Sequence, residues 1–164
     1  MKIKQYNRTQ AISYAEKWAF SRNPAYYNFD PIGGDCTNFI SQCIYSGSNV
    51  MNFNNINGWY YKNGYNRSPS WSGVEFLYKF LTTNKSVGPF GLETEKENIQ
   101  IGDVVQLSFS GNEFQHSTIV VNINNFELNN IYIASHTFDS FNKPLIDYNF
   151  KKIRFIHIEN VRFN

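Results

Sequence analysis

The chain has 164 residues, a length that fits one domain able to bury a core without a metal ion or disulfides. Its net charge is only +2 and its fifteen Lys and Arg residues are scattered, which excludes nucleic acid as the main partner because phosphate binding needs a basic face. No apolar run approaches the ~20 residues of a membrane span, and the N-terminus lacks the apolar core of a signal peptide, so we expect a cytoplasmic protein, or a secreted one if a leader was removed.

Three segments in the first half have the residue pattern of helices. Apolar residues at helical spacing predict the first from about Thr9 to Ser21. The second is expected from Cys36 to about Ser46, with Gly47 as its C-terminal cap. The third is expected from Ser72 to Leu81. Residues 48–70 are rich in Asn, Gly and aromatic residues, which is typical of a long irregular segment, and such segments are often functional.

The second of these helices begins with an informative motif. The motif reads Gly33-Gly34-Asp35-Cys36-Thr37-Asn38-Phe39-Ile40-Ser41-Gln42. Asp35 suits the N-cap, because its carboxylate can accept hydrogen bonds from the free N–H groups of the first turn. Cys36 then occupies about the first helical position, where the positive end of the helix dipole favours the nucleophilic thiolate. We therefore predict that Cys36 is a catalytic nucleophile rather than a buried apolar residue.

The other cysteine, Cys43, is expected to have a different role. Seven positions separate it from Cys36, about 10 Å along a helix that rises ~1.5 Å per residue, whereas a disulfide needs Cα atoms within ~7 Å. Cys43 shares a helical face with Phe39, Ile40 and Ile44, which predicts a place in the core. No C-x-x-C or H-x-x-x-H spacing is present, so neither a metal site nor a cofactor is expected.

The second half of the chain has the pattern of β-strands. Strands are predicted at residues 104–109, 117–123, 131–135 and 152–158, separated by polar turns. Helices followed by strands predict an α+β protein in which an antiparallel sheet packs on the cysteine helix. Residues 1–164 show no internal repeat or linker, so we expect a single domain.

Three histidines, all in this half, are available as the base that accompanies the thiol, and His116 is the one that we favour. His116 lies where a polar turn meets an apolar strand, so its imidazole is expected at the rim of the sheet, within reach of a helix N-terminus. There its imidazolium would stabilise the Cys36 thiolate, and the thiol pKa in such pairs can fall to about 3–4. His157 alternates inside a late strand without a companion motif, so we interpret it as structural.

A third polar group is expected to orient the imidazole of His116. His136 follows the strand predicted to neighbour that of His116, so its side chain could hydrogen-bond His116 across the pair. Asp139 is the rival, because a carboxylate is the better electrostatic partner, although it lies in the following turn. Asn142 is a more remote candidate. The residues alone leave this choice open.

Donors for the oxyanion of an acyl-transfer reaction are also expected near the cysteine. The N–H group of Cys36 is one, and a hydroxyl of Tyr26 or Tyr27 could be the second, although aromatic packing explains either tyrosine equally well. Asp35 could in addition bind a substrate amine if one of its oxygens faces the groove. The aromatic residues that could wall such a groove, or equally fill the core, are Trp59, Tyr60 and Trp71.

Taken together, these residues resemble the putative amidase domain family of Gram-positive bacteria, within the papain-like superfamily that includes the NlpC-type cell-wall peptidases. The resemblance covers most of the chain, and the motif around Cys36 is its most specific part. Gly102-Asp103-Val104 is weak alone. The other matching residues are Tyr6-Asn7-Arg8, Ala11, Tyr14-Ala15, Trp18-Ala19, Arg22-Asn23-Pro24, Tyr27, Phe29, Trp59-Tyr60, Ser70-Trp71, His116-Ser117 and His136-Thr137.

The resemblance implies a papain-like fold and cysteine amidase or peptidase chemistry, with peptidoglycan stem peptides as the suspected substrate. It implies Cys36 as nucleophile, His116 as base and about His136 as the third polar residue. The twenty residues between the two histidines are more than in many relatives, so Asp139 remains open as the third residue.

We therefore expect a thiol-dependent amide hydrolase that needs no cofactor and acts on a peptide or a small acyl or amine substrate. One alternative keeps the site but transfers the acyl group to an amine, as an amide synthase or transamidase of a biosynthetic pathway. Another is a non-catalytic module that binds peptide or glycan in an aromatic groove. The sequence does not specify the bond that reacts or the oligomeric state.

Overall fold

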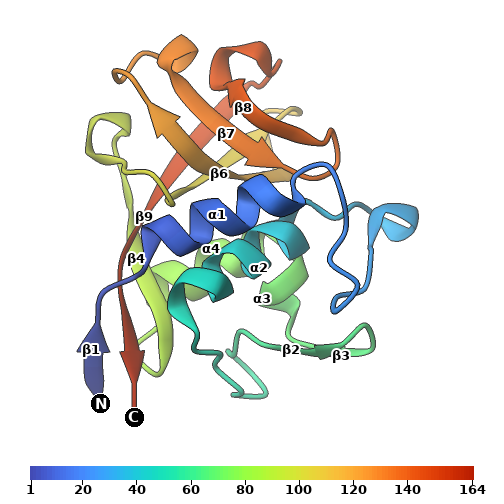
Figure 1. The fold of residues 1–164 in the computed structure, drawn as a ribbon, viewed down its shortest axis with the longest axis vertical. Coiled ribbons are helices and arrows are strands. Elements are labelled where there is room, and N and C mark those ends of the chain that lie inside the picture. Colours follow the sequence, from blue (N-terminus) through green and yellow to red (C-terminus); the bar gives the residue numbers. More distant parts are fainter.

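The computed structural model describes residues 1–164 and consists of an antiparallel sheet with helices packed against one face (Figure 1). The predicted α+β class is confirmed. Strands of the sheet follow the order β1-β9-β5-β6-β7-β8, and β4 also pairs with β9. Their bounds are β1 (Lys2–Lys4), β4 (Gly88–Thr94), β5 (Val104–Ser108), β6 (His116–Ile123), β7 (Ile131–Ser135), β8 (Ser140–Pro144) and β9 (Lys152–Phe163).

The four strands expected in the second half are all present, but the other three strands of this sheet, β1, β4 and β8, were not predicted. Among these, β4 pairs antiparallel with β9 along its whole length, although its sequence contains two glycines and a proline that are typical of turns. The register shifts between Phe90 and Gly91. At Gly91 a Cβ atom would lie only 2.0 Å from the carbonyl oxygen of His157, so the close approach of the two strands requires glycine.

The two long N-terminal helices lie side by side against the sheet (Figure 1). Helix α1 (Arg8–Trp18) ends before the predicted Ser21, and Asn7 caps it by accepting a hydrogen bond from the N–H group of Gln10 at 3.0 Å. Helix α2 (Cys36–Ser48) begins at the cysteine as predicted.

The predicted cap at Gly47 is wrong, because Gly47 lies inside α2 and the helix ends at Asn49 in the left-handed conformation. A Cβ atom at Gly47 would lie 2.5 Å from the ring of Tyr6 and 2.6 Å from the carbonyl oxygen of Asn7. The glycine is therefore explained by the close approach of the chain before α1, and not by a turn.

The segment between α2 and the next helices is only partly irregular. It contains the short hairpin of β2 (Tyr61–Asn63) and β3 (Asn66–Arg67). Two helices follow, α3 (Pro69–Ser72) and α4 (Val74–Thr83), where the sequence predicted a single helix. The remaining elements are the single-turn 3-10 segments η1 (Asp30–Ile32), η2 (Lys96–Asn98), η3 (Leu128–Asn130) and η4 (Leu145–Asp147).

Buried apolar side chains form one core on each face of the sheet. The larger core lies between helices and sheet, and it includes the predicted core residue Cys43. The smaller core, on the opposite face, contains Val105, Leu107, Val120, Ile133 and Tyr148 among others. Neither cysteine forms a disulfide. None of the helices has the length and apolar character needed to cross a bilayer.

Asp103, from the Gly102-Asp103 motif, connects α1 to β9. Its buried carboxylate accepts hydrogen bonds from Arg8 at 2.7 Å, from the N–H group of Ile158 at 3.0 Å and from Nδ1 of His157 at 2.8 Å. His157 is thus part of a network that joins the first helix to the last strand, and this network explains the motif without a catalytic role.

Candidate active site

Cys36 occupies the first position of α2, and its side chain is turned toward the start of β6. Its Sγ lies 3.7 Å from Oγ1 of Thr37 and 4.0 Å from the carbonyl oxygen of Gln115. Burial raises the pKa of the Cys36 thiol, while hydrogen bonds from the N–H group of Ser117 and from Thr37 act in the opposite direction. The thiol is therefore protonated near neutral pH in this structure.

His116, the first residue of β6, follows directly on the carbonyl group that contacts this thiol. Its ring packs near those of Phe109, Phe138 and Tyr148, with centroids 6.1, 6.1 and 5.6 Å away. The side chain is 2% exposed, and its Nε2 atom is buried without a hydrogen-bond partner. Burial, and secondarily the charge of Lys143, lower the pKa of His116 to about 4.

The expected ion pair between Cys36 and His116 is not formed in this structure. The thiol contacts residues on either side of His116, but no hydrogen bond joins it to the imidazole. Because burial raises the pKa of the thiol and lowers that of the imidazole, both groups are uncharged near neutral pH. The arrangement is a neutral thiol beside a neutral, unpaired base.

His136 lies beside Asp35 and not beside His116. Its Nδ1 atom is 2.6 Å from Oδ2 of Asp35, its Nε2 atom is 2.7 Å from the carbonyl oxygen of Trp18, and its ring stacks on Phe39. The expected hydrogen bond between the two histidines is absent, because both ring nitrogens of His136 are already occupied. The two neighbours of the ring, a carboxylate oxygen and a backbone carbonyl oxygen, are both hydrogen-bond acceptors.

Asp35 occupies the N-cap position of α2 as predicted, but its carboxylate makes no capping hydrogen bond to the first turn. Its Oδ1 atom accepts hydrogen bonds from the N–H group of Phe29 at 2.9 Å and the side-chain amide of Asn38 at 2.8 Å, while Oδ2 faces His136. The carboxylate is 1% exposed, so it cannot bind a substrate amine as the sequence suggested. The first N–H groups of α2 thus remain without a side-chain cap.

Asp139, the other candidate for orienting the base, is part of a different ion pair. Its two carboxylate oxygens accept hydrogen bonds from Arg22 at 2.9 and 3.1 Å. The same guanidinium binds Asp30 at 2.7 and 3.0 Å and lies 3.7 Å from Asp35. The structure therefore brings neither Asp139 nor His136 into contact with the imidazole of His116.

The aromatic candidates for a groove are mostly packed in the core. Trp59 and Trp71 are fully buried and cannot wall an open groove; their indole N–H groups donate to Ser41 and Asn38. Tyr26 stacks on Trp71, and burial raises its pKa to about 12. Two candidates are more accessible: Tyr60 is half-buried and packs on Phe53, and Tyr27 is 44% exposed with its ring against Phe29.

The open space beside His116 is a cleft that sequence reasoning missed. It has a volume of about 280 Å³. Three of its walls, Phe109, Phe138 and Tyr148, also pack around the imidazole. Charged and polar groups come from Lys143, Asp147 and Asn149. These residues belong to loops and strand ends without a motif; the one available signal was an exposed aromatic residue directly after His136-Thr137.

The loop between β7 and β8 is held against the start of α2 with strained backbone. Thr137 and Phe138 have positive φ angles of 53° and 76°, which are uncommon for such residues. The hydroxyl of Thr137 accepts a hydrogen bond from the N–H group of Asp35 at 2.9 Å, and a Cβ atom at Gly34 would lie 3.0 Å from it. Strain of this kind collects at functional sites, and here it places Phe138 over the cleft.

The buried imidazole of His116 is expected to reduce the stability of the protein at acid pH. The pKa of His116 falls from 6.5 in the unfolded chain to about 4 in the folded one. Between these two values the unfolded state binds a proton that the folded state does not. The neutral His116 therefore imposes no loss of unfolding free energy above pH 6.5, and the loss grows as the pH falls toward 4. The shift corresponds to about 3 kcal/mol.

Urea unfolding at pH 7 and pH 4.5 of the protein and of a His116→Gln variant measures this effect. The variant should lose less stability between the two values, while the carboxylates common to both proteins cancel in the comparison. Equal losses in the two proteins would contradict the pKa assigned to His116.

The sequence of this chain is similar to a protein family and to two bacterial proteins. The model of a family described as a putative amidase domain matches residues 5–158. The chain is 39% identical over 124 residues to the uncharacterized protein YhbB of Bacillus subtilis strain 168. This alignment covers 71% of this chain and 37% of that protein. It is 23% identical over 150 residues to the uncharacterized protein YjcM of the same strain, covering 87% of this chain and 33% of that protein.

The chain thus spans about a third of the length of these curated relatives. No solved structure matches it. No three His, Cys, Asp or Glu side chains gather into a set that could hold a metal ion.

Proposed function

Because the chain belongs to the putative amidase domain family, we propose that it is a cysteine-dependent amide hydrolase in which Cys36 is the nucleophile and His116 the base. The whole of residues 1–164 serves as one catalytic domain in this proposal. The proposal is supported by the position of the cysteine at the start of a helix and of the histidine at the start of an antiparallel strand, the order that we expect for a papain-like enzyme.

One observation carries the proposal, the unpaired imidazole of His116. Buried polar atoms almost always have a hydrogen-bond partner, and an exception in a folded protein calls for an explanation. The Nε2 atom of His116 is such an exception, and it belongs to the residue between the two backbone groups that contact the Cys36 thiol. A base reserved for a proton from the thiol or the substrate explains why it has no partner.

The proposed reaction starts from the neutral thiol and the neutral imidazole. His116 accepts the proton of the thiol as Sγ attacks the substrate carbonyl, so the C–S bond forms while the carbonyl π bond opens to an oxyanion. No hydrogen bond joins the two groups in the free protein, so one of them moves when substrate binds. The uncapped N–H groups at the start of α2, including that of Cys36, are the donors for the oxyanion.

Collapse of the intermediate breaks the amide C–N bond, and His116 gives its proton to the departing amine. Water then attacks the thioester with His116 again as base, which releases the acid and restores the thiol. Proton transfer of this kind contributes about 10²–10⁴-fold to the rate. In this scheme His136 and Asp35 hold the first turn of α2 in place and take no part in the proton transfer.

The cleft beside His116 limits the group next to the scissile bond. Its volume of about 280 Å³ is just below the usual range of ligand pockets, and aromatic residues make up half of its lining. Lys143 and Asp147 offer one charge of each sign, which suits the carboxylate and amine of a peptide residue. Peptidoglycan stem peptides, which combine short side chains with such groups, are the substrates that we propose to test first.

Trapping of the acyl-enzyme tests the proposal directly. The protein is incubated with stem-peptide fragments, quenched in acid and analysed by mass spectrometry after digestion. We expect an acyl group on the peptide that contains Cys36, none on Cys43, and the free acid as product. An added primary amine should leave the acid as the main product.

The other outcomes have clear meanings. An amide as the main product in the presence of the amine would replace hydrolysis by acyl transfer. Tight binding of the fragments with neither adduct nor product would indicate a binding module, and would contradict the proposed role of Cys36.

A further inference from the structure

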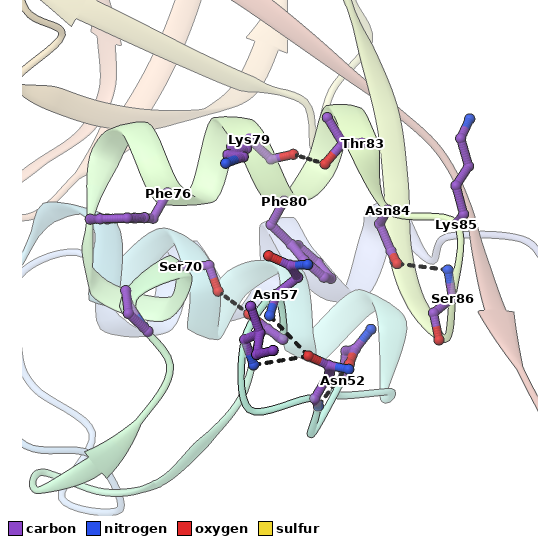
Figure 2. A pocket seen from close by; sticks show the side chains of 14 residues that line it. Asn52, Asn57, Ser70, Phe76, Lys79, Phe80, Thr83, Asn84, Lys85 and Ser86 are labelled. Carbon is purple, nitrogen blue, oxygen red and sulfur yellow. Dashed lines mark hydrogen bonds between the residues drawn. The ribbon is translucent and has the colours of Figure 1, made fainter.

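A second cavity lies apart from the cysteine, between α4, the loop of residues 52–58 and the turn that follows α4 (Figure 2). It has a volume of about 600 Å³, within the range of ligand pockets, and more than twice that of the cleft beside His116. The two cavities share no lining residue. A ligand in this cavity would therefore not compete directly for the cleft.

The loop that forms one wall is held in shape by its own asparagine side chains. Oδ1 of Asn54 accepts hydrogen bonds from the N–H groups of Ile56 and Asn57, both at 2.9 Å. Oδ1 of Asn52 accepts from the N–H group of Asn54 at 3.0 Å, and its Nδ2 donates to the carbonyl of Val87 at 3.0 Å. The wall is thus preformed, which lowers the ordering cost of binding.

Polar groups that remain free line the same space. The backbone N–H groups of Asn57 and Ser86 donate the hydrogen bonds that hold the loop and the turn. The side-chain amide of Asn57 and the hydroxyl of Ser86 therefore remain available to a ligand. Such groups match the hydroxyls of a sugar, since each can donate as well as accept a hydrogen bond.

The charge of the lining is entirely positive. None of its fourteen residues is acidic, and two are the exposed lysines Lys79 and Lys85. Neither forms an ion pair with a carboxylate of the protein, so both are available to an anion. Figure 2 shows Lys79 on α4 and Lys85 at the rim of the cavity, with the Lys85 side chain extended away from it.

Apolar surface completes the cavity. Phe80 points from α4 toward Asn57 and forms the floor, where it stacks on the buried Trp59 (Figure 2). Phe76 lies at the edge and is 58% exposed, and Ile56 is 86% exposed. An exposed aromatic ring beside polar groups offers a surface on which the C–H face of a sugar ring can stack.

We propose that this cavity binds a segment of an anionic glycan built from carboxylated sugars. Lys79 and Lys85 pair with its carboxylates, Asn57 and Ser86 bind hydroxyls, and Phe76 stacks on a sugar ring at the other end of the cavity (Figure 2). All three features are needed for this choice, because an acidic peptide would use the lysines without the hydroxyl donors, and a neutral sugar would leave both cations unpaired.

Calorimetric titration with tri-galacturonate, a carboxylated trisaccharide, tests the proposal against the neutral maltotriose and the peptide tri-glutamate. We expect tri-galacturonate to bind best, and the double variant Lys79→Gln/Lys85→Gln to weaken it about 10-fold or more. Phe76→Ala should weaken tri-galacturonate and leave any binding of tri-glutamate unchanged. Lys2→Gln, which removes an exposed lysine far from the cavity in sequence, is the matched control.

The result is independent of the proposed amidase activity, because Cys36→Ala should bind tri-galacturonate as the parent protein does. Equal or better binding of tri-glutamate would show that the cavity takes acidic peptides and would overturn the assignment. So would the absence of tri-galacturonate binding at millimolar concentration, or binding that the double variant does not change while its melting temperature is unaltered.

Discussion

Replacing Cys36 with serine is expected to reduce amide hydrolysis by about 10⁴-fold or more, the scale seen when a nucleophile is removed from a catalytic unit. The serine hydroxyl is far less acidic than a thiol, so the same base removes its proton much less readily, and the resulting nucleophile forms too slowly to support turnover. The measurement is kcat/KM on the stem-peptide substrate identified by trapping, together with the melting temperature of each protein.

Cys43→Ala is the matched control for this experiment. Cys43 is fully buried in the core between the helices and the sheet, so its replacement should lower the melting temperature more than the replacement of Cys36 while leaving kcat/KM nearly unchanged. The double variant Cys36→Ser/His116→Gln should be no slower than Cys36→Ser alone, because the two groups act as a unit. Hydrolysis at the parent rate by Cys36→Ser would rule out Cys36 as the nucleophile.

The variant Asp35→Asn is expected to lose about 3–5 kcal/mol of unfolding free energy, the usual cost of breaking a buried ion pair from one side. Asp35 and His136 are each only 1% exposed and lie 2.6 Å apart. The amide of asparagine would leave one ring nitrogen of His136 without a full acceptor in a place that water does not reach. Urea unfolding at pH 7 measures the loss, with the linear dependence on urea checked in both proteins.

Asp139→Asn provides the comparison. This carboxylate also binds Arg22, but it is 34% exposed, and pairs of this kind contribute about 1 kcal/mol or less. A much larger loss of unfolding free energy in Asp35→Asn than in Asp139→Asn would establish that the buried carboxylate of Asp35 stabilises the start of α2. Similar small losses in both would show that the hydrogen bonds of Asp35 are readily replaced.

Local patterns in the sequence predicted much of the fold. The alternation of apolar residues located four strands, and helical spacing located α1, α2 and α4, because these signals come from neighbours within one element. They failed for β4, whose glycines are required by contact with β9, a strand more than sixty residues away. Gly47 misled for the same reason, since the residue that requires it is Tyr6.

For the candidate site, the sequence predicted the position of the cysteine but not the contacts of the residues around it. The motif placed Cys36 at the start of a helix, as observed. The position of Asp35 also predicted a cap, but a histidine 101 residues later binds that carboxylate, and no local pattern contains this partner. Trp59 and Trp71 show the converse difficulty, because an aromatic residue has the same signature in a core as in a groove.

The position of β9 in the sheet has a consequence for the biosynthesis of this protein. Residues 152–163 pair with three strands, β1, β4 and β5, so the strand that joins the sheet together is made after all its neighbours in the sheet. Until β9 leaves the ribosome, the helices have only part of the sheet to pack on, β4 has no partner strand, and β5 is paired only with β6. In a nascent chain that lacks β9, these strand edges and the apolar surface beside them are therefore open to chaperones, and the sheet is completed only after β9 has been made.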